Sequence, residues 1–275
     1  MQPTADRKAV RPRRVRFSYE DLPRHWFGGD PVATHVANGL HLLFPAGERF
    51  FVRSVRHYLP LFENDPEMKA LIRGFAGQEA SHSKEHERVA EILEAQGFEV
   101  RDFMKRFEKW TFEVMEPYLP PALRLAATAA CEHYTAMLAE DAFTEEFFRS
   151  HAHEGIRSLL MWHAAEEIEH KAVAFDVLQR VNDSWALRAA GMVLASAVLG
   201  IAWSLATRML LAQEGYDGTK VSEGLKRIRE LEGRDVRKDV FLRGFIEYLK
   251  PGFHPWNNDN RALIEGFLAE LEVAA

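Results

Sequence analysis

The chain has 275 residues, of which 47% are hydrophobic and 28% charged, as in a globular protein large enough for one large domain or two small ones. Its single cysteine, Cys131, excludes a disulfide scaffold and a cysteine-rich zinc or iron–sulfur site. The net charge of −6 argues against a protein made mainly to bind nucleic acid. The first residues lack the apolar core of a secretory signal, so we expect a cytoplasmic protein.

The chain begins with a basic segment, residues 1–16, that has six Lys and Arg residues against one Asp. We expect a flexible, solvated arm here, and contact with anionic lipid or nucleic acid is the alternative. Helical periodicity then dominates residues 17–183, and residues 98–118 are expected to connect two of its helices. The spacing and the Pro and Gly residues at the ends predict four long helices, at about 33–59, 66–96, 121–149 and 154–181.

The remainder, residues 184–275, is predicted to be a helical extension packed on this bundle, with helices at about 186–212, 220–232, 236–250 and 259–272. The first of them contains nineteen residues without a charge, Ala189–Thr207, close to the ~20 apolar residues that cross a bilayer. Small residues are frequent in it, and Arg188 and Arg208 flank it symmetrically. We therefore expect a buried or interface helix. Attachment to a membrane surface, helped by the basic arm, and a true membrane span are the alternatives.

Each of the four long helices has an apolar stripe that is interrupted near its middle by a glutamate. Two of these glutamates begin a Glu-x-x-His motif, which places carboxylate and imidazole on one helical face. One glutamate at the edge of a stripe can reach water, but four buried carboxylates together require compensating positive charge. The residues concerned are Glu48, Glu79, His82, Glu132, Glu167 and His170.

The positions of two of these glutamates along their helices place them at one height. Glu48 lies 11 residues before the Leu59-Pro60 helix end, and Glu79 lies 13 residues after Pro66. With a rise of ~1.5 Å per residue, both are roughly 17–20 Å from the turn between their helices. Four carboxylates balance two divalent cations, and carboxylate with imidazole suits iron or manganese better than a closed zinc site. We predict two Fe ions, with Mn or a mixed Mn/Fe pair as alternatives.

In order along the chain, this set resembles the ligand set of ferritin-like di-iron carboxylate proteins. Three stretches also resemble a bacterial family described as predicted metal-dependent hydrolases, over nearly all of the chain after residue 15. The resemblance implies an all-α fold, with a ferritin-like four-helix bundle followed by an α-helical C-terminal extension. The stretches are FPAGERFF at 44–51, QEASH at 78–82 and WHAAEEIEHKAVAFD at 162–176.

The same resemblance implies roles for residues around the ligands. In many di-iron proteins the residue before each Glu-x-x-His bonds the histidine of the opposite pair, and Gln78 and Glu166 hold these positions here. His86 and His163 fall on the apolar stripes, as extra metal ligands or as buried core histidines. His86 stands where tyrosyl-radical reductase subunits have a tyrosine, which argues against a radical role.

Three neighbours of these motifs are expected to take no part in the site. Glu169 and Lys171 are expected on the helix surface, and Cys131 as a small core residue beside Glu132.

The chain contains no Gly-x-Ser-x-Gly elbow, P-loop or dinucleotide-binding turn. We therefore expect a non-haem di-iron oxidase or oxygenase that oxidises a small, apolar organic substrate and needs O2 and an electron donor. The alternative is a metal-dependent hydrolase that uses a hydroxide bridging two metals, and iron storage or a structural metal bundle is a third reading. No nucleic-acid partner is expected, and a homodimer is left open.

Overall fold

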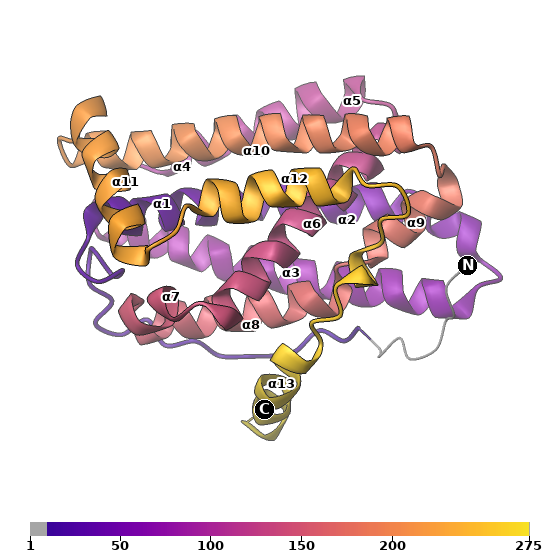
Figure 1. The fold of residues 1–275 in the computed structure, drawn as a ribbon, viewed down its shortest axis with the longest axis horizontal. Coiled ribbons are helices and arrows are strands. Elements are labelled where there is room, and N and C mark those ends of the chain that lie inside the picture. Colours follow the sequence, from indigo (N-terminus) through magenta and orange to yellow (C-terminus); the bar gives the residue numbers. More distant parts are fainter. Residues whose placement is uncertain (1–9, 275) are drawn as a thin grey trace.

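The computed structural model describes residues 10–274 and is all-α, as predicted. The described residues form no strand, apart from one isolated bridge between Phe27 and Ala152. Four helices from separate parts of the chain pack around a common interior (Figure 1). They are α2 (Phe44–Arg56), α3 (Pro66–Ala95), α6 (Pro121–Thr144) and α8 (Glu154–His170).

The first predicted helix, 33–59, is broken in two. α1 (Pro31–His41) ends before α2 begins, and the 3₁₀ turn η1 (Leu59–Phe62) follows α2. Pro45 explains the break, because proline has no backbone N–H and its ring clashes with the carbonyl four residues earlier, here that of His41. The break turns α2 into a separate helix that packs closely on α3.

The third and fourth predicted helices are also shorter than expected. Glu145 has an extended backbone and separates α6 from α7 (Glu146–His151). α8 ends at His170, and α9 (Val173–Val181) follows after a two-residue turn. Lys171 in this turn was expected on the surface but is buried, because its ammonium donates to Asn258 O and Asn260 Oδ1, both at 2.7 Å. The C-terminal segment thus holds the chain where α8 ends.

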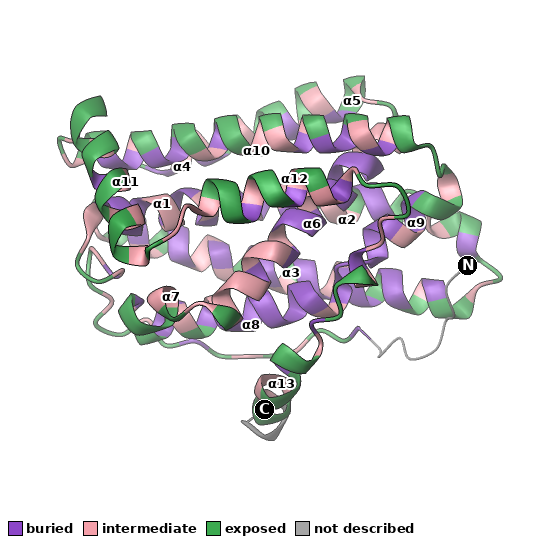
Figure 2. Ribbon diagram, in the orientation of Figure 1, coloured by how far each residue is buried: buried purple, intermediate pink, exposed green. Residues whose placement is uncertain are grey.

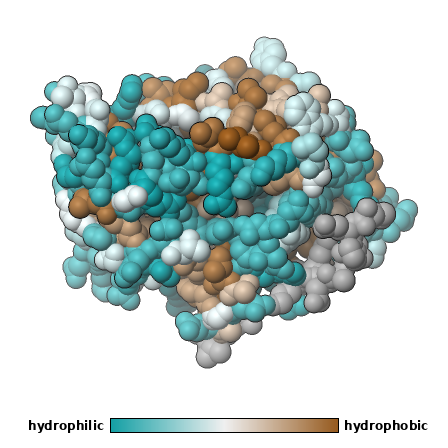
Figure 3. All heavy atoms as spheres, in the orientation of Figure 1, coloured by the Kyte–Doolittle hydropathy of each residue, from teal (hydrophilic) through white to brown (hydrophobic). Residues whose placement is uncertain are grey.

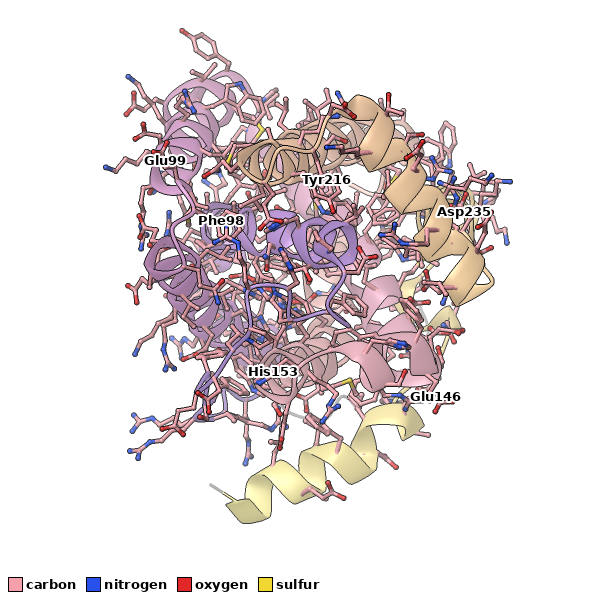
Figure 4. All side chains as sticks on the ribbon, turned by 90° about the vertical axis from the view of Figure 1, so that its left-hand side faces the viewer. Phe98, Glu99, Glu146, His153, Tyr216 and Asp235 are labelled. Carbon is pink, nitrogen blue, oxygen red and sulfur yellow. The ribbon has the colours of Figure 1, made fainter. Side chains whose placement is uncertain are left out.

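The remaining elements lie outside the four central helices. Figure 4 views the end of the molecule that is on the left in Figure 1, where Phe98 follows α3 and Tyr216 follows α10. α13 lies apart from α10 in this view and packs on α8 and α6. These elements are α4 (Arg101–Lys109), the π-helix η2 (Trp110–Met115), α5 (Glu116–Tyr118), α10 (Trp185–Gln213), α11 (Gly218–Glu232), the π-helix η3 (Arg237–Leu242), α12 (Arg243–Tyr248), the 3₁₀ turn η4 (Pro255–Asn257) and α13 (Ala262–Ala274).

α10 contains the long uncharged stretch and is buried on one side only (Figure 2). It packs on α6 and α1, and a Cβ added to Gly191 would lie only 2.5 Å from the carbonyl carbon of Ala126. Arg188 is buried, and its guanidinium donates to Lys250 O at 2.8 Å. By length and composition α10 could cross a membrane, and only 28% of its most apolar window is buried within the protein. α10 therefore packs on α6 and α1 with one side and leaves an apolar side facing outward.

The described part of the basic segment packs against the bundle, although the sequence predicts a flexible arm for residues 1–16. Val10 is buried against α3, where a Cβ on Gly74 would lie 2.2 Å from Val10 O. Arg13 is bound by carboxylates of α8, as described below. The absence of a side chain at Gly74 and these acidic partners explain why Val10 and Arg13 pack on the protein, whereas Arg11, Pro12, Arg14 and Arg16 are exposed. Residues 1–9 lie outside the described part of the chain.

Candidate metal centre

The structure brings together the six residues that the sequence predicts as metal ligands. Each comes from the middle or the end of one of the four central helices, and each is buried, with 0–3% of its surface exposed. α2 contributes Glu48, α6 contributes Glu132, and the two Glu-x-x-His motifs lie on α3 and α8. Because the motifs place carboxylate and imidazole on one helical face, all six side chains point into one interior.

One group in this interior consists of three carboxylates around one imidazole. The nearest carboxylate oxygens of Glu79, Glu132 and Glu167 lie 3.1, 3.2 and 3.4 Å from His170 Nε2. One ligand atom from each of these four residues lies within 4.8 Å of the others. This spacing fits one metal ion with nitrogen and oxygen ligands.

A second group lies beside the first and shares one carboxylate with it. Glu48, Glu79 and His82 also have ligand atoms within 4.8 Å of one another. His82 Nδ1 is 3.8 Å from Glu79 Oε2 and 3.6 Å from Glu167 Oε1. Glu79 therefore stands between the two groups, as a carboxylate bridging two metal ions would.

The buried polar atoms of the cluster fit a metal and do not satisfy one another. Both carboxylate oxygens of Glu48, Glu79 and Glu132 lack a hydrogen-bond partner, and so do His82 Nδ1 and His170 Nε2. Buried polar groups almost always have a partner, so this number of unpartnered atoms in one place requires an explanation. Divalent cations bound among these atoms would satisfy all of them at once.

The pKa shifts in the cluster also indicate that it lacks compensating positive charge when no metal is bound. Burial and the neighbouring carboxylates of Glu79 and Glu167 raise the pKa of Glu48 well above its usual range. Burial and Glu167 also raise the pKa of Glu132. Burial lowers the pKa of His170, but Glu167 and Glu132 outweigh it and raise that pKa well above normal. Without metal, the cluster therefore takes up protons to reduce its negative charge.

The residue before each Glu-x-x-His motif contacts the histidine of the opposite pair. His82 Nε2 is 3.0 Å from Glu166 Oε2, and His170 Nδ1 is 2.9 Å from Gln78 Oε1. In both histidines the other ring nitrogen faces the carboxylates. These contacts fix the orientation of each ring and turn its other nitrogen toward the place that a metal would occupy.

Arg13 is hydrogen bonded to Glu166 directly and is linked to Gln78 through Glu169. The sequence alone does not indicate this role of Arg13. Its guanidinium donates to Glu166 Oε1 at 3.2 Å and to the two oxygens of Glu169 at 2.5 and 2.8 Å. Gln78 Nε2 donates to the same Glu169 carboxylate at 2.9 Å. Glu169 was expected on the helix surface, but it lies between α8, α3 and the N-terminal segment because Arg13 and Gln78 bind it there.

Three further histidines form a buried chain that leads away from the cluster. His163 Nε2 is 2.9 Å from Glu167 Oε1, His86 Nε2 is 2.8 Å from His163 Nδ1, and His41 Nδ1 is 2.7 Å from His86 Nδ1. Burial lowers the pKa of all three, that of His41 to about 3. Three neutral rings can make all of these hydrogen bonds if each ring donates to the next acceptor in the direction of Glu167: His41 to His86, His86 to His163, and His163 to Glu167. Glu48 Oε1 lies 3.7 Å from His163 Nε2 and 3.8 Å from His86 Nε2, so both remain within reach of a metal.

Thr135 is a residue at the cluster that the sequence analysis missed. Its hydroxyl hydrogen bonds to Glu167 Oε2 and lies 3.1 Å from Glu132 O. It is one turn after Glu132 on α6, and this spacing could have indicated it.

An apolar pocket adjoins the cluster at Thr135. Its wall also includes Cys131, where burial raises the pKa of the thiol to about 12, so this thiol stays neutral. Gly47, the neighbour of Glu48, lies on the same wall. The lining is otherwise almost wholly apolar and comes from α1, the turn between α1 and α2, α2, α4, η2, α6 and α10: Leu40, Leu43, Phe44, Phe50, Phe51, Phe107, Thr111, Met115, Ala127, Tyr134, Leu138, Leu194, Ala195, Val198, Leu199 and Ala202.

The fold and the cluster together define an all-α protein with a buried glutamate–histidine centre suited to metal. A family model described as "Predicted metal-dependent hydrolase" matches residues 11–259. The chain therefore belongs to the family of predicted metal-dependent hydrolases. Comparison with curated proteins finds no match, and comparison with solved structures finds none either. The likeness to ferritin-like bundles stays a prediction.

Proposed function

We propose that the cluster binds two divalent metal ions and that the protein is a metal-dependent hydrolase of an apolar ester or related acyl compound. The observation that carries the metal is the set of unpartnered carboxylate and imidazole atoms in one buried place. The family description supports hydrolysis as the reaction. When bound, the metals would supply Lewis acidity and a nucleophilic water at neutral pH.

The chain's own residues would then have separate tasks. Glu79 would hold the two ions together, because it belongs to both groups of ligand atoms. The apolar pocket would bind the hydrocarbon part of the substrate and exclude water, and its wall at Thr135 would place the polar end beside Glu167. Hydrolysis joins the oxygen of a water molecule to the acyl carbon, breaks the bond between that carbon and its leaving oxygen, and gives a proton of the water to the leaving group. His163, His86 and His41 offer a hydrogen-bonded path for proton exchange at Glu167.

A second candidate is a di-iron oxidase or oxygenase. The observation that favours it is the pocket, in which only Thr111, Cys131, Tyr134 and Thr135 bear polar side-chain atoms. Such a lining suits an apolar substrate without any hydrolysable group. This reaction would need redox-active iron, O2 and an electron donor.

One experiment separates the two candidates. The metal-free protein is loaded with Zn²⁺, Mn²⁺ or Fe²⁺ under anaerobic conditions and tested with 4-nitrophenyl esters of increasing chain length. Hydrolysis by the Zn²⁺ or Mn²⁺ form, which is lost in Glu132→Gln, supports the hydrolase. If no form hydrolyses these esters and the Fe²⁺ form consumes O2 after air is admitted, the oxidase is supported and the hydrolase is rejected.

A further inference from the structure

The outward side of α10 is an uncharged stripe of mostly apolar residues. Val193, Ile201 and Leu205 are 56, 62 and 55% exposed, which is unusual for large aliphatic side chains. The exposed residues from 186 to 205 occur at helical spacing and none of them is charged, since Arg188 is turned inward and buried. The stripe is therefore an apolar surface that the described residues of this chain do not cover.

The elements on both sides of α10 extend this surface. Trp203 of α10 contacts Phe241 of η3, with ring centroids 5.5 Å apart, and η2 lines the same pocket as α10. Figure 3 shows hydrophobic surface over the upper part of the molecule, where Figure 1 places α10. Among the described residues, nine of the twelve exposed large hydrophobic ones lie on α10, η2 and η3 and on α5 and α12, which adjoin η2 and η3. We call this surface the α10 face: Trp110, Val114, Tyr118, Trp185, Val193, Ile201, Leu205, Leu242 and Ile246.

The charges bordering the α10 face are less acidic than those of the whole chain. The elements that carry its nine residues, η2, α5, α10, η3 and α12, have five Lys and Arg residues against four Asp and Glu, whereas the chain has a net charge of −6. Arg188 is buried, and the exposed basic residues are Arg208, Arg237, Lys238 and Arg243. Trp110, Tyr118 and Trp185 add the exposed aromatic residues that are enriched where proteins meet the headgroup region of a bilayer. An apolar stripe flanked by basic and aromatic residues is complementary to an anionic lipid surface.

We propose that the α10 face docks on an anionic lipid bilayer, with α10 lying in the plane of the headgroups. α10 does not cross the bilayer, because Gly191 is in close contact with Ala126 of α6 and Arg188 is held by Lys250 O. A span would expose both contacts to lipid and leave Arg188 without its backbone acceptor. Docking leaves the fold as it is and buries only the α10 face.

The position of the pocket beside α10 suggests what docking would do for substrate binding. α10 lines the pocket with Leu194, Val198 and Leu199, while Val193 and Ile201 face outward one helical side away. A docked molecule would hold its apolar pocket beside the acyl chains, from which a lipid-soluble substrate could enter. This consequence rests on the proposed function, whereas docking itself requires neither metal nor activity.

Flotation of the full chain with lipid vesicles tests the docking. We expect binding to phosphatidylcholine vesicles that contain phosphatidylglycerol, weaker binding to phosphatidylcholine alone, and release by high salt. Ile201→Asp and Leu205→Asp should each reduce binding by about tenfold, because each places a charge on the inserted stripe. Leu231→Asp is the matched control, since Leu231 is 67% exposed but lies on α11, outside the α10 face. Circular dichroism and thermal unfolding establish that each variant is folded.

Three results would overturn the proposal. The wild-type protein does not float with anionic vesicles, or Leu231→Asp weakens binding as much as Ile201→Asp. In the third result, the protein does not bind vesicles and is a dimer that Ile201→Asp converts to a monomer. This result would show that the α10 face contacts a second copy of the chain. Because vesicle binding is measured without substrate or metal, failure here is distinct from failure of the proposed function.

Discussion

The carboxylate of Glu166 lies 3.0 Å from Nε2 of His82, across the interface between α8 and α3. Glu166 directly precedes Glu167 on α8. Glu167 belongs to the cluster, whereas Glu166 contacts the ring nitrogen of His82 that points away from it. This contact holds the His82 ring with Nδ1 toward the carboxylates, and it makes that nitrogen a better metal ligand.

Glu166→Gln should therefore weaken metal binding by about 10- to 100-fold without preventing folding, because an amide orients and polarises the imidazole less than a carboxylate does. Competition with a chelator of known affinity measures the change. Glu91→Gln is the matched control, since Glu91 is exposed on α3. Equal affinities in the two variants would mean that Glu166 has no influence on the metal.

Arg13 should influence both histidines from outside the cluster. It binds Glu166 directly and reaches Gln78 through Glu169. We expect Arg13→Ala to lower metal affinity and Arg13→Lys to restore part of it, because lysine keeps the charge but not the two-pronged geometry. Arg14→Ala, at an exposed neighbouring position, should leave the affinity unchanged. A loss of thermal stability in Arg13→Ala with unchanged metal affinity would reduce Arg13 to a packing role.

Metal binding should release protons at pH 7. Burial lowers the pKa of His82, but the carboxylates of Glu166 and Glu79 outweigh it and raise that pKa to about 9. His82 is then protonated at pH 7 in the metal-free protein, and the metal must displace the proton on Nδ1. Affinity should increase as the pH rises toward 9, and the number of protons released should fall as the pH passes 9. Calorimetric titration in buffers of different ionisation enthalpy measures this number, and an enthalpy that is independent of the buffer would refute the prediction.

Thr135→Val should reduce turnover by about tenfold or more while metal content stays the same. The substitution keeps the shape of the side chain but removes a hydroxyl hydrogen bonded to the charged Glu167. Thr111→Val is the control, because Thr111 also lines the pocket but its hydroxyl bonds only to Phe107 O among the described contacts. If both variants lose activity equally, the effect comes from the shape of the pocket and not from Glu167.

Part of this structure could be predicted from the sequence because helical spacing determines which side chains share a face. The apolar stripes predict that Glu48, Glu79, Glu132 and Glu167 are buried between their helices, and the structure brings them together. The break before Glu48 could also have been predicted, since Pro45 removes a hydrogen bond within the expected helix.

Other features depend on contacts between residues far apart in the chain. Arg13 and Glu169 look like surface residues until the N-terminal segment is seen to pack along α3 and α8. Lys171 also looks like a surface residue in the sequence, because its acceptors, Asn258 and Asn260, are far away along the chain. Helical spacing carries no information on such partners, so these three residues could not be placed from the sequence.

The number of metal ions bound per chain tests the central claim most directly. We predict about two Fe, Mn or Zn ions per chain after reconstitution and removal of excess metal, measured by elemental analysis on a folded protein. Glu79→Gln should lose both ions together, because Glu79 belongs to both groups of ligand atoms. A wild-type protein that retains no metal, or a Glu79→Gln variant that still binds two ions with unchanged affinity, would contradict the claim that this cluster is a two-metal centre.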